Sequence, residues 1–278
     1  MARPYLLGSV AYDPKVVTIW EGFKRLFEAR GFAFDFVLYS NYERQVEALL
    51  AGHVDASWSS PLAWIEAERA ARAKGREARA VCMRDTDRDL TSVIAVRSDS
   101  PIRSLADLKG RRVAVGASDS PQATLIPLGH LIAAGLAPER DVQVVRHEVL
   151  VGKHGDHIGG ERDAAKALLA GQADAACMID LNHLAFQKDG TLPTGATRVL
   201  AQTGRYDHCN VTVLDAPGPD EQRFVELLLA MRWDDPEARP LLELEGLKAW
   251  VPGRTSGYAL LNAAVDALGT IDPWLRGL

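Results

Sequence analysis

The 278-residue sequence has few cysteines and no long apolar run. Its three cysteines, Cys82, Cys177 and Cys209, are an odd number at scattered spacing, which excludes a disulfide framework. No run of about 18 apolar residues exists, so the sequence predicts no transmembrane segment. A net charge of −5 leaves no basic excess, which argues against nucleic acid as a partner. With 47% hydrophobic residues, the chain is typical of a globular protein.

Common catalytic and targeting motifs are missing as well. There is no phosphate-binding loop of the Gly-x-x-x-x-Gly-Lys-Ser/Thr type, no Gly-x-Gly-x-x-Gly, no Gly-x-Ser-x-Gly and no His-Glu-x-x-His. The absence of these motifs argues against an enzyme, and we expect no cofactor. The chain enters an apolar strand at Tyr5–Val10 without the charged and apolar regions of a signal peptide. This favours a cytoplasmic location, or a periplasmic one if a leader has been removed.

One stretch of sequence occurs twice. Residues 48–56 are Ala-Leu-Leu-Ala-Gly-His-Val-Asp-Ala, and residues 167–175 are Ala-Leu-Leu-Ala-Gly-Gln-Ala-Asp-Ala. Both copies predict an amphipathic helix that ends at a glycine in the left-handed conformation, Gly52 or Gly171, and a short apolar strand after it. The repeat predicts two lobes that share one architecture.

The elements upstream of each copy also match. A strand runs into a short loop and then into a helix that begins with proline, first at 6–10 and Pro14, then at 112–115 and Pro121. Proline after Asp or Ser is a helix-start signal. Each half is strand–helix–strand–helix–strand, which predicts an α/β fold of mainly parallel sheets with helices on both faces. The loops after the first strands would face a cleft between the lobes, where ligands bind in such folds.

Hydrophobic periodicity assigns the elements and the lobes. Helices are predicted at 14–30, 42–51, 61–74, 121–134, 161–170, 180–188, 219–231, 236–248 and 256–268. Strands are predicted at 4–10, 33–39, 54–58, 79–83, 91–97, 112–116, 141–148, 173–179, 197–202 and 209–214. Turn residues between two strands mark the passage from one lobe to the other. We therefore expect lobe 1 to be discontinuous, 1–96 plus 206–278, and lobe 2 to be 97–205.

Motifs over most of the chain match a known family. They are Asn41-Tyr42, the stretch 52–56, the turn Trp58-Ser59-Ser60-Pro61, the stretch 100–110 and the turn 160–165. On these residues the sequence resembles the phosphate/phosphite/phosphonate-binding proteins, solute receptors of ABC transporters with the type II periplasmic-binding fold. The resemblance implies domain closure on a small anionic ligand (phosphonate-like, phosphate-like or a carboxylate) and an ABC transporter permease as partner.

The sequence differs from the family at the anion-binding loop. Where the family has Ser-Thr-Ser-Gly, residues 118–122 are Ser-Asp-Ser-Pro-Gln, and the family's histidine and tyrosine are Arg162 and Leu90. A helix start offers free N–H groups to anions, although Ser120 can equally act as a cap only. Arg162 offers a bidentate grip on an anion, and Asp180 either caps a helix or binds the ligand. The predicted ligand-binding residues are Tyr12, Tyr42, Ser59, Ser118, Ser120, Gln122, Arg162 and Asp180.

Two segments contain residues of the types that bind zinc. The candidates are His154 and His157 in a glycine-rich loop, and His208 and Cys209 near the second passage between lobes. Because their spacing fixes no common face, we expect no metal site. The same residues keep an alternative open, a cytosolic enzyme on the periplasmic-binding fold: a biosynthetic synthase or lyase that uses His, Cys and Arg in the cleft.

Overall fold

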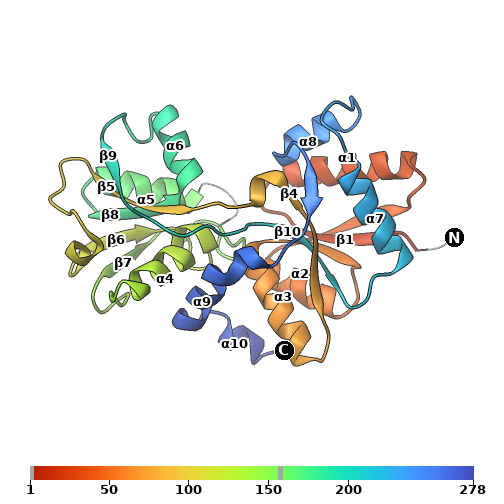
Figure 1. The fold of residues 1–278 in the computed structure, drawn as a ribbon, viewed down its shortest axis with the longest axis horizontal. Helices are drawn as coiled ribbons and strands as arrows, with labels where there is room; N and C mark the ends of the chain where they lie inside the picture. Colours follow the sequence, from red (N-terminus) through yellow and green to blue (C-terminus); the bar gives the residue numbers. More distant parts are fainter. Residues whose placement is uncertain (1–2, 156–158) are drawn as a thin grey trace. The chain divides into compact units, whose positions relative to one another are not determined.

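The computed structural model describes residues 3–155 and 159–278, which divide into two compact units (Figure 1). Unit 1 comprises Met1–Arg88, Asp207–Gly257 and Trp274–Leu278, and unit 2 comprises Asp89–Tyr206 and Tyr258–Pro273. His157 lies outside the described residues. Among the described residues, no helix is both long and apolar enough to cross a membrane.

The unit boundaries differ from those expected from the sequence, lobe 1 at 1–96 plus 206–278 and lobe 2 at 97–205. Strand β5 (Ser92–Arg97) belongs to unit 2, because it pairs with strands β8 and β9 of that unit. Helix α9 (Ala259–Leu268) also belongs to unit 2. Its Ala264 packs so closely on Gly129 that an added Cβ at that glycine would lie 2.7 Å from the Ala264 Cβ.

Unit 1 is built on a six-stranded sheet in the order β11-β4-β10-β3-β1-β2. Its strands are β1 (Tyr5–Val10), β2 (Phe34–Tyr39), β3 (Ala56–Ser59), β4 (Ala78–Arg84), β10 (Asn210–Leu214) and β11 (Trp250–Pro252). Figure 1 shows helices on both faces of this sheet. One face carries α1 (Lys15–Ala29), α7 (Pro219–Leu229) and α8 (Arg239–Glu245), and the other carries α2 (Tyr42–Leu50) and α3 (Pro61–Ala73).

Aromatic side chains fill the larger core of unit 1. Phe27 of α1 lies edge-on to Phe34 at 5.2 Å and to Phe224 of α7 at 5.9 Å between ring centroids. All three rings are at most 1% exposed. Their burial removes large apolar areas from water, which is the main force that holds α1 and α7 on this face.

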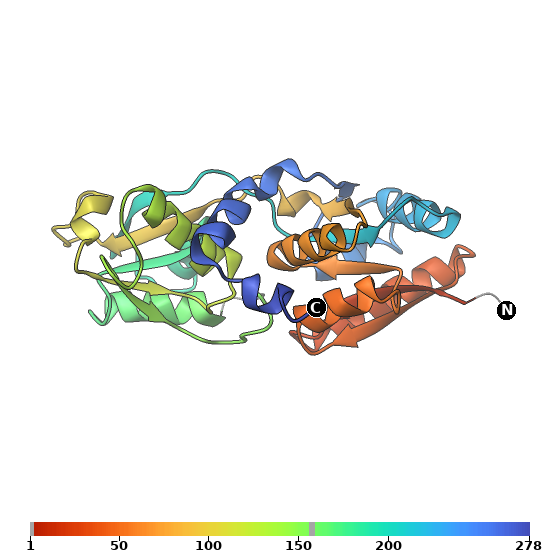
Figure 2. The same ribbon diagram turned by 90° about the horizontal axis from the view of Figure 1, so that it is seen from below.

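Unit 2 has a five-stranded sheet in the order β7-β6-β8-β5-β9. Its remaining strands are β6 (Arg112–Val115), β7 (Gln143–Arg146), β8 (Ala175–Ile179) and β9 (Thr197–Gln202). Helices α5 (Gly159–Leu169) and α6 (Asp180–Lys188) cover one face, and α4 (Ile126–Ala133) covers the other. Figure 2 shows α9, in dark blue, beside α4, in green.

The strands of unit 2 alternate between two cores, as the period of two along a strand requires. Val93 and Ala95 of β5 pack in the core under α5 and α6. Ile94 and Val96 pack in the core under α4. Because both faces of β5 are buried, the strand is a continuous apolar run in the sequence, which is why it is predicted so well.

The α/β class with helices on both faces is confirmed, but both sheets are mixed rather than mainly parallel. In unit 1, β1 pairs in parallel with β2 and β3, whereas the β10–β3, β10–β4 and β11–β4 pairs are antiparallel. In unit 2, β6 pairs in parallel with β7 and β8, whereas β5 is antiparallel to β8 and β9. In each unit the strands of the sequence repeat pair in parallel, whereas β5, β10 and β11 run in the opposite direction.

The sequence repeat corresponds to a structural repeat down to single hydrogen bonds. Gly52 and Gly171 both end their helices with positive φ, 71° and 68°. Three residues later, Asp55 accepts the backbone N–H of Leu6 at 2.8 Å, and Asp174 accepts that of Arg112 at 2.9 Å. Both carboxylates also pair with an arginine, Arg3 or Arg112. Each aspartate thus anchors the first strand of its repeat, β1 or β6, beside the third, β3 or β8.

We expect Asp174→Ala to lower the free energy of unfolding by about 1–3 kcal/mol, because it leaves a strand N–H and the Arg112 guanidinium without their acceptor. Asp55→Ala should cost a similar amount, since its contacts are equivalent. Urea unfolding followed by circular dichroism measures both. Asp99→Ala is the control, since that side chain is 84% exposed. Equal stability of the Asp174 and Asp99 variants would contradict the anchoring role.

Candidate functional site

Buried polar side chains gather at one edge of the unit 2 sheet. Because β6 and β8 are parallel and β5 runs antiparallel to β8, the carboxyl ends of β6 and β8 meet the amino end of β5 there. Ligands of α/β folds bind at such edges. We call this group the polar cluster; its members are Ser92, Gln122, Glu161, Asn182 and Tyr206.

Glu161 is the central residue of the polar cluster and is only 2% exposed. It enters the interior because α5 begins with two glycines. A Cβ at Gly160 would lie 2.7 Å from the carbonyl oxygen of His147 and 3.0 Å from the Cα of Gly116. Only glycine permits this close approach of α5 to His147 and Gly116. The approach places the next residue, Glu161, at the end of β8.

The Glu161 carboxyl group accepts hydrogen bonds, and none of the residues that the structure describes forms a salt bridge with it. Its Oε2 accepts the backbone N–H of Ile179 and the side-chain amide of Asn182, both at 2.9 Å. Burial raises the pKa of Glu161 to about 7, and these hydrogen bonds act in the opposite direction. The group is therefore poised to exchange a proton near neutral pH.

Gln122 is a further hydrogen-bonding neighbour of Glu161. Its amide nitrogen donates to the backbone carbonyl of Gly155 at 2.8 Å. The contact between the Gln122 and Glu161 side chains lowers the pKa of Glu161, as a donor to the carboxylate does, and so opposes the effect of burial. Gln122 Oε1 and Glu161 Oε1 accept no hydrogen bond from the residues that the structure describes.

Ser92 and Tyr206 hold the backbone at the start of the helix. The Ser92 hydroxyl donates to the backbone carbonyl of Gln122 at 2.6 Å and lies 2.8 Å from the Tyr206 hydroxyl. Both residues are buried. The helix begins as one wide turn, Pro121–Leu125, and continues into α4, so these contacts satisfy a carbonyl that regular helical bonding leaves open.

The serines of the predicted anion loop have other partners. The Ser120 hydroxyl accepts the backbone N–H of Ala123 at 3.2 Å and therefore caps the helix. The Ser118 N–H donates to Glu148 at 2.9 Å. Asp119 accepts the N–H groups of Gly152 and His154 at 2.5 and 3.3 Å. The loop is thus tied to segment 148–155, which also supplies the carbonyl bound by Gln122.

Arg162 and Asp180 do not extend the polar cluster. The Arg162 guanidinium binds Asp189 at 2.8 Å, contacts the Thr191 hydroxyl and stacks 4.6 Å from the centre of the Phe186 ring. Arg162 holds the carboxyl end of α6, a role that the local sequence cannot distinguish from anion binding. Asp180, the first residue of α6, accepts the Thr91 hydroxyl at 2.7 Å and the N–H of Leu181 at 2.7 Å.

The three predicted residues of unit 1 lie at the carboxyl ends of β1 and β3 or on the helices that follow. Tyr12 is half-buried against the aromatic core, with Lys15 over its ring at 5.9 Å. Tyr42 begins α2 and is 1% exposed among apolar neighbours. Ser59 ends β3, and its hydroxyl lies 2.9 Å from that of Ser57. Tyr12 and Tyr42 thus pack against apolar neighbours, and Ser59 bonds to Ser57.

The histidine and cysteine candidates fall in different places. His154 is buried in unit 2 and has a φ of 50°. His208 and Cys209 lie in unit 1, where His208 Nδ1 is 3.1 Å from the Cys209 sulfur. Neither of these two belongs to the polar cluster.

Sequence reasoning missed most of the polar cluster: Gln122 was predicted, whereas Ser92, Glu161, Asn182 and Tyr206 were not. The signal that points to Glu161 is the Gly159-Gly160 pair before it, because paired glycines at a helix start indicate close backbone approach. No local pattern reveals Ser92 or Tyr206, since strand pairing alone brings them to the helix start.

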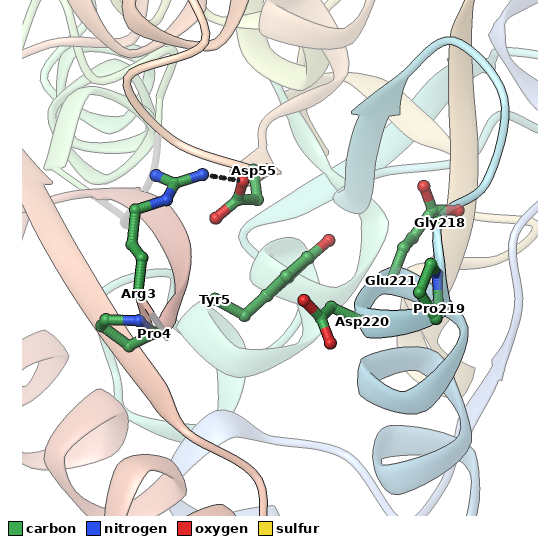
Figure 3. Close-up of a pocket in the computed structure, with 8 residues that line it drawn as sticks. All are labelled: Arg3, Pro4, Tyr5, Asp55, Gly218, Pro219, Asp220 and Glu221. Carbon is green, nitrogen blue, oxygen red and sulfur yellow. Dashed lines mark hydrogen bonds and ion pairs between the residues drawn. The ribbon is translucent and has the colours of Figure 1, made fainter. Parts of the chain in front are cut away.

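A separate pocket of about 240 Å³ lies at the amino end of β1 in unit 1 (Figure 3). Its lining includes Tyr5 and the carboxylates Asp55, Asp220 and Glu221, and the adjacent Arg3 is already paired with Asp55 at 2.5 Å. Figure 3 shows these carboxylates around the Tyr5 ring. The excess of negative charge disfavours an anion there.

Comparison with known proteins agrees with the architecture. A family model described as "ABC transporter, phosphonate, periplasmic substrate-binding protein" matches residues 11–258. Among solved structures, PhnD1 from Prochlorococcus marinus in complex with methylphosphonate is 17% identical, with a TM-score of 0.67 over 97% of this chain and 100% of that one.

Two further structures share the fold. XAC2383 from Xanthomonas citri bound to ATP is 18% identical, with a TM-score of 0.73 over 98% of this chain and 99% of that one. The periplasmic aliphatic sulphonate binding protein SsuA from Escherichia coli is 20% identical, with a TM-score of 0.58 over 98% and 89%. These likenesses confirm the periplasmic-binding fold predicted from the sequence.

Replacement of Glu161 by Gln should flatten part of the pH dependence of stability. In the unfolded chain Glu161 ionises near its ordinary value of 4.5, and in the folded protein near 7. The folded protein therefore holds the proton more tightly, and stability falls as pH rises from about 4.5 to 7. The shift corresponds to about 3 kcal/mol.

Glu161→Gln mimics the neutral acid, because its carbonyl can accept the hydrogen bonds from Ile179 and Asn182 while its amide carries no charge. The free energy of unfolding of Glu161→Gln should exceed that of the wild type by an amount that grows between about pH 4.5 and 7 and stays constant above pH 7. Melting temperatures at several pH values measure the difference. Glu139→Gln is the control, since that side chain is 56% exposed. A wild-type minus Glu161→Gln difference that is independent of pH would exclude a raised pKa of Glu161 in the folded protein.

Proposed function

The chain belongs to the family of periplasmic substrate-binding proteins of phosphonate ABC transporters, and from this premise we propose that its polar cluster receives a small phosphonate-like anion. As in the rest of the family, the ligand is a small anion and the partner is a transporter permease. The observation that carries the assignment to this site is the buried Glu161, whose pKa is raised, beside Gln122 at the carboxyl ends of β6 and β8.

The electrostatics of the polar cluster support an anion as long as Glu161 is neutral. The helix that starts at Pro121 directs the positive end of its dipole toward this edge of the sheet. A neutral Glu161 adds no opposing charge, whereas an ionised one repels the ligand. Anion binding and protonation of Glu161 therefore favour each other.

Segment 148–155 is the part of unit 2 most directly coupled to the ligand. It bonds to the Gln122 side chain through Gly155 and to Asp119 through Gly152. A ligand that breaks or strengthens the hydrogen bond from Gln122 to Gly155 therefore changes the attachment of segment 148–155 to the start of the helix. The enzyme alternative is not favoured, because Arg162 is held by Asp189 and Thr191, and His208 and Cys209 lie outside the polar cluster.

We expect methylphosphonate to bind the wild-type protein and Gln122→Ala to weaken binding by roughly tenfold, the cost of about one hydrogen bond to a charged group. Isothermal titration calorimetry with methylphosphonate, phosphate and a small alkanesulfonate tests this. The matched control is Arg162→Ala, which should bind as well as wild type because its guanidinium has partners within unit 2. The opposite result, loss only in Arg162→Ala, would place the anion elsewhere.

Affinity for the anion should also fall with rising pH. Since burial sets the pKa of Glu161 to about 7, the wild-type dissociation constant should increase between pH 6 and pH 8 more steeply than that of Glu161→Gln. A sulfonate, which stays singly charged over this range, is the ligand of choice. Parallel pH profiles of the two proteins would show that Glu161 is not linked to the ligand.

A further inference from the structure

Three side chains with metal-binding atoms converge in unit 1. Asp87 ends the short turn Asp85–Asp87 after β4, and His208 and Cys209 directly precede β10. Their ligand atoms all lie within 4.8 Å of one another. Asp87 is 2% exposed, Cys209 is 3% exposed and the His208 side chain is 12% exposed, so the group is almost fully enclosed.

The distances within this group fit a common metal ion. His208 Nδ1 lies 3.1 Å from Cys209 Sγ and 3.6 Å from Asp87 Oδ1. In a tetrahedral zinc site, bond lengths of about 2.0–2.3 Å place neighbouring ligand atoms roughly 3.5 Å apart. The observed separations are close to that value. A small ion at the centre would need only minor side-chain adjustment.

The same geometry argues against a proton relay of the Cys-His-Asp type. Such a relay uses both ring nitrogens of histidine, one toward the nucleophile and one toward the carboxylate. Here the sulfur and the carboxylate both face Nδ1. Three donors directed at one point are what coordination requires.

Surrounding contacts orient the ligands. The backbone N–H of His208 donates to the Asp87 carbonyl at 2.7 Å, which ties the two segments together. Arg84 holds the Asp87 carboxylate through bonds of 2.6 and 2.8 Å and lies over the Trp58 ring at 5.2 Å. Carboxylate ligands of metals are commonly fixed by such outer hydrogen bonds.

The charges also fit a divalent ion. Arg84 is shared between Asp87 and Glu245, whose carboxylate lies 3.3 Å from Nη1. If Cys209 binds as a thiolate, the charges of Asp87, Glu245 and the thiolate balance those of Arg84 and a divalent metal. A buried site with balanced charge avoids the large penalty of an unpaired ion.

We propose that Asp87, His208 and Cys209 form a zinc-type metal site that joins the turn after β4 to the start of β10. The mixture of sulfur, nitrogen and oxygen donors selects Zn²⁺ or Co²⁺ over Mg²⁺ and Ca²⁺, which prefer oxygen alone. Three protein ligands leave a fourth position for water or another donor. The metal would fix the segments at which the chain leaves and re-enters unit 1, next to Arg88 and Asp207.

Titration of the chelator-treated full-length protein with Co²⁺ tests the site. We expect one equivalent to bind and to produce a thiolate-to-cobalt charge-transfer band in the near ultraviolet. Cys209→Ser should abolish the band and weaken binding by more than about tenfold. Cys177→Ser is the matched control, since Cys177 is a buried cysteine of unit 2, and it should keep both the band and the affinity.

Zn²⁺ should displace Co²⁺ and raise the melting temperature of the wild-type protein, because a ligand of the folded state stabilises it. His208→Asn provides a second variant if Cys209→Ser folds poorly, with circular dichroism as the check on folding. Absence of the thiolate band in the wild type, or its survival in Cys209→Ser, would overturn the proposal. Neither result depends on anion binding.

Discussion

The parallel pairing of the first and third strands of each repeat, β1 with β3 and β6 with β8, is the constraint on which the rest of the structure depends. Asp55 and Asp174 enforce it by bonding to the N–H groups of Leu6 and Arg112. Because parallel strands point the same way, this pairing brings two carboxyl ends to one sheet edge in each unit. The following loops and helix starts are then forced together, so a shared binding edge is a consequence of the pairing itself.

Burial of an acid at that edge opposes stability, since it disfavours the ionised form without a compensating cation. Glu161 lies there because Gly160, which has no Cβ, lets the start of α5 pack against His147 and Gly116. Its carboxyl group is in hydrogen-bonding contact with Gln122, which in turn bonds to Gly155. These side-chain contacts link α5, the start of the helix at Pro121 and segment 148–155, three parts of unit 2 that are distant in the sequence.

Features that depend on local pattern were predicted from the sequence, including the glycine caps at Gly52 and Gly171 and nearly every helix and strand. Strand direction was not, because the antiparallel course of β5 and β10 follows from long-range pairing that periodicity cannot detect. Strand β11, only three residues long, gives no periodic signal at all. Arg162 was predicted as an anion contact. Its contacts with Asp189 and Phe186 were not predicted, because these residues are distant from it in the sequence.

The two units differ in how they close their corresponding edges. In unit 1, Gln45 of α2 donates to the carbonyls of Gly8 and Trp58 at 2.7 and 3.0 Å, and so bridges β1 and β3 with an amide. In unit 2, the register of the repeat places Ala164 at the position of Gln45 and Glu161 at the position of Tyr42. Unit 2 therefore bonds at its corresponding edge through the Glu161 carboxyl, which titrates, and not through an amide, which does not. The charge of this edge responds to pH near neutrality, because burial raises the pKa of Glu161 to about 7.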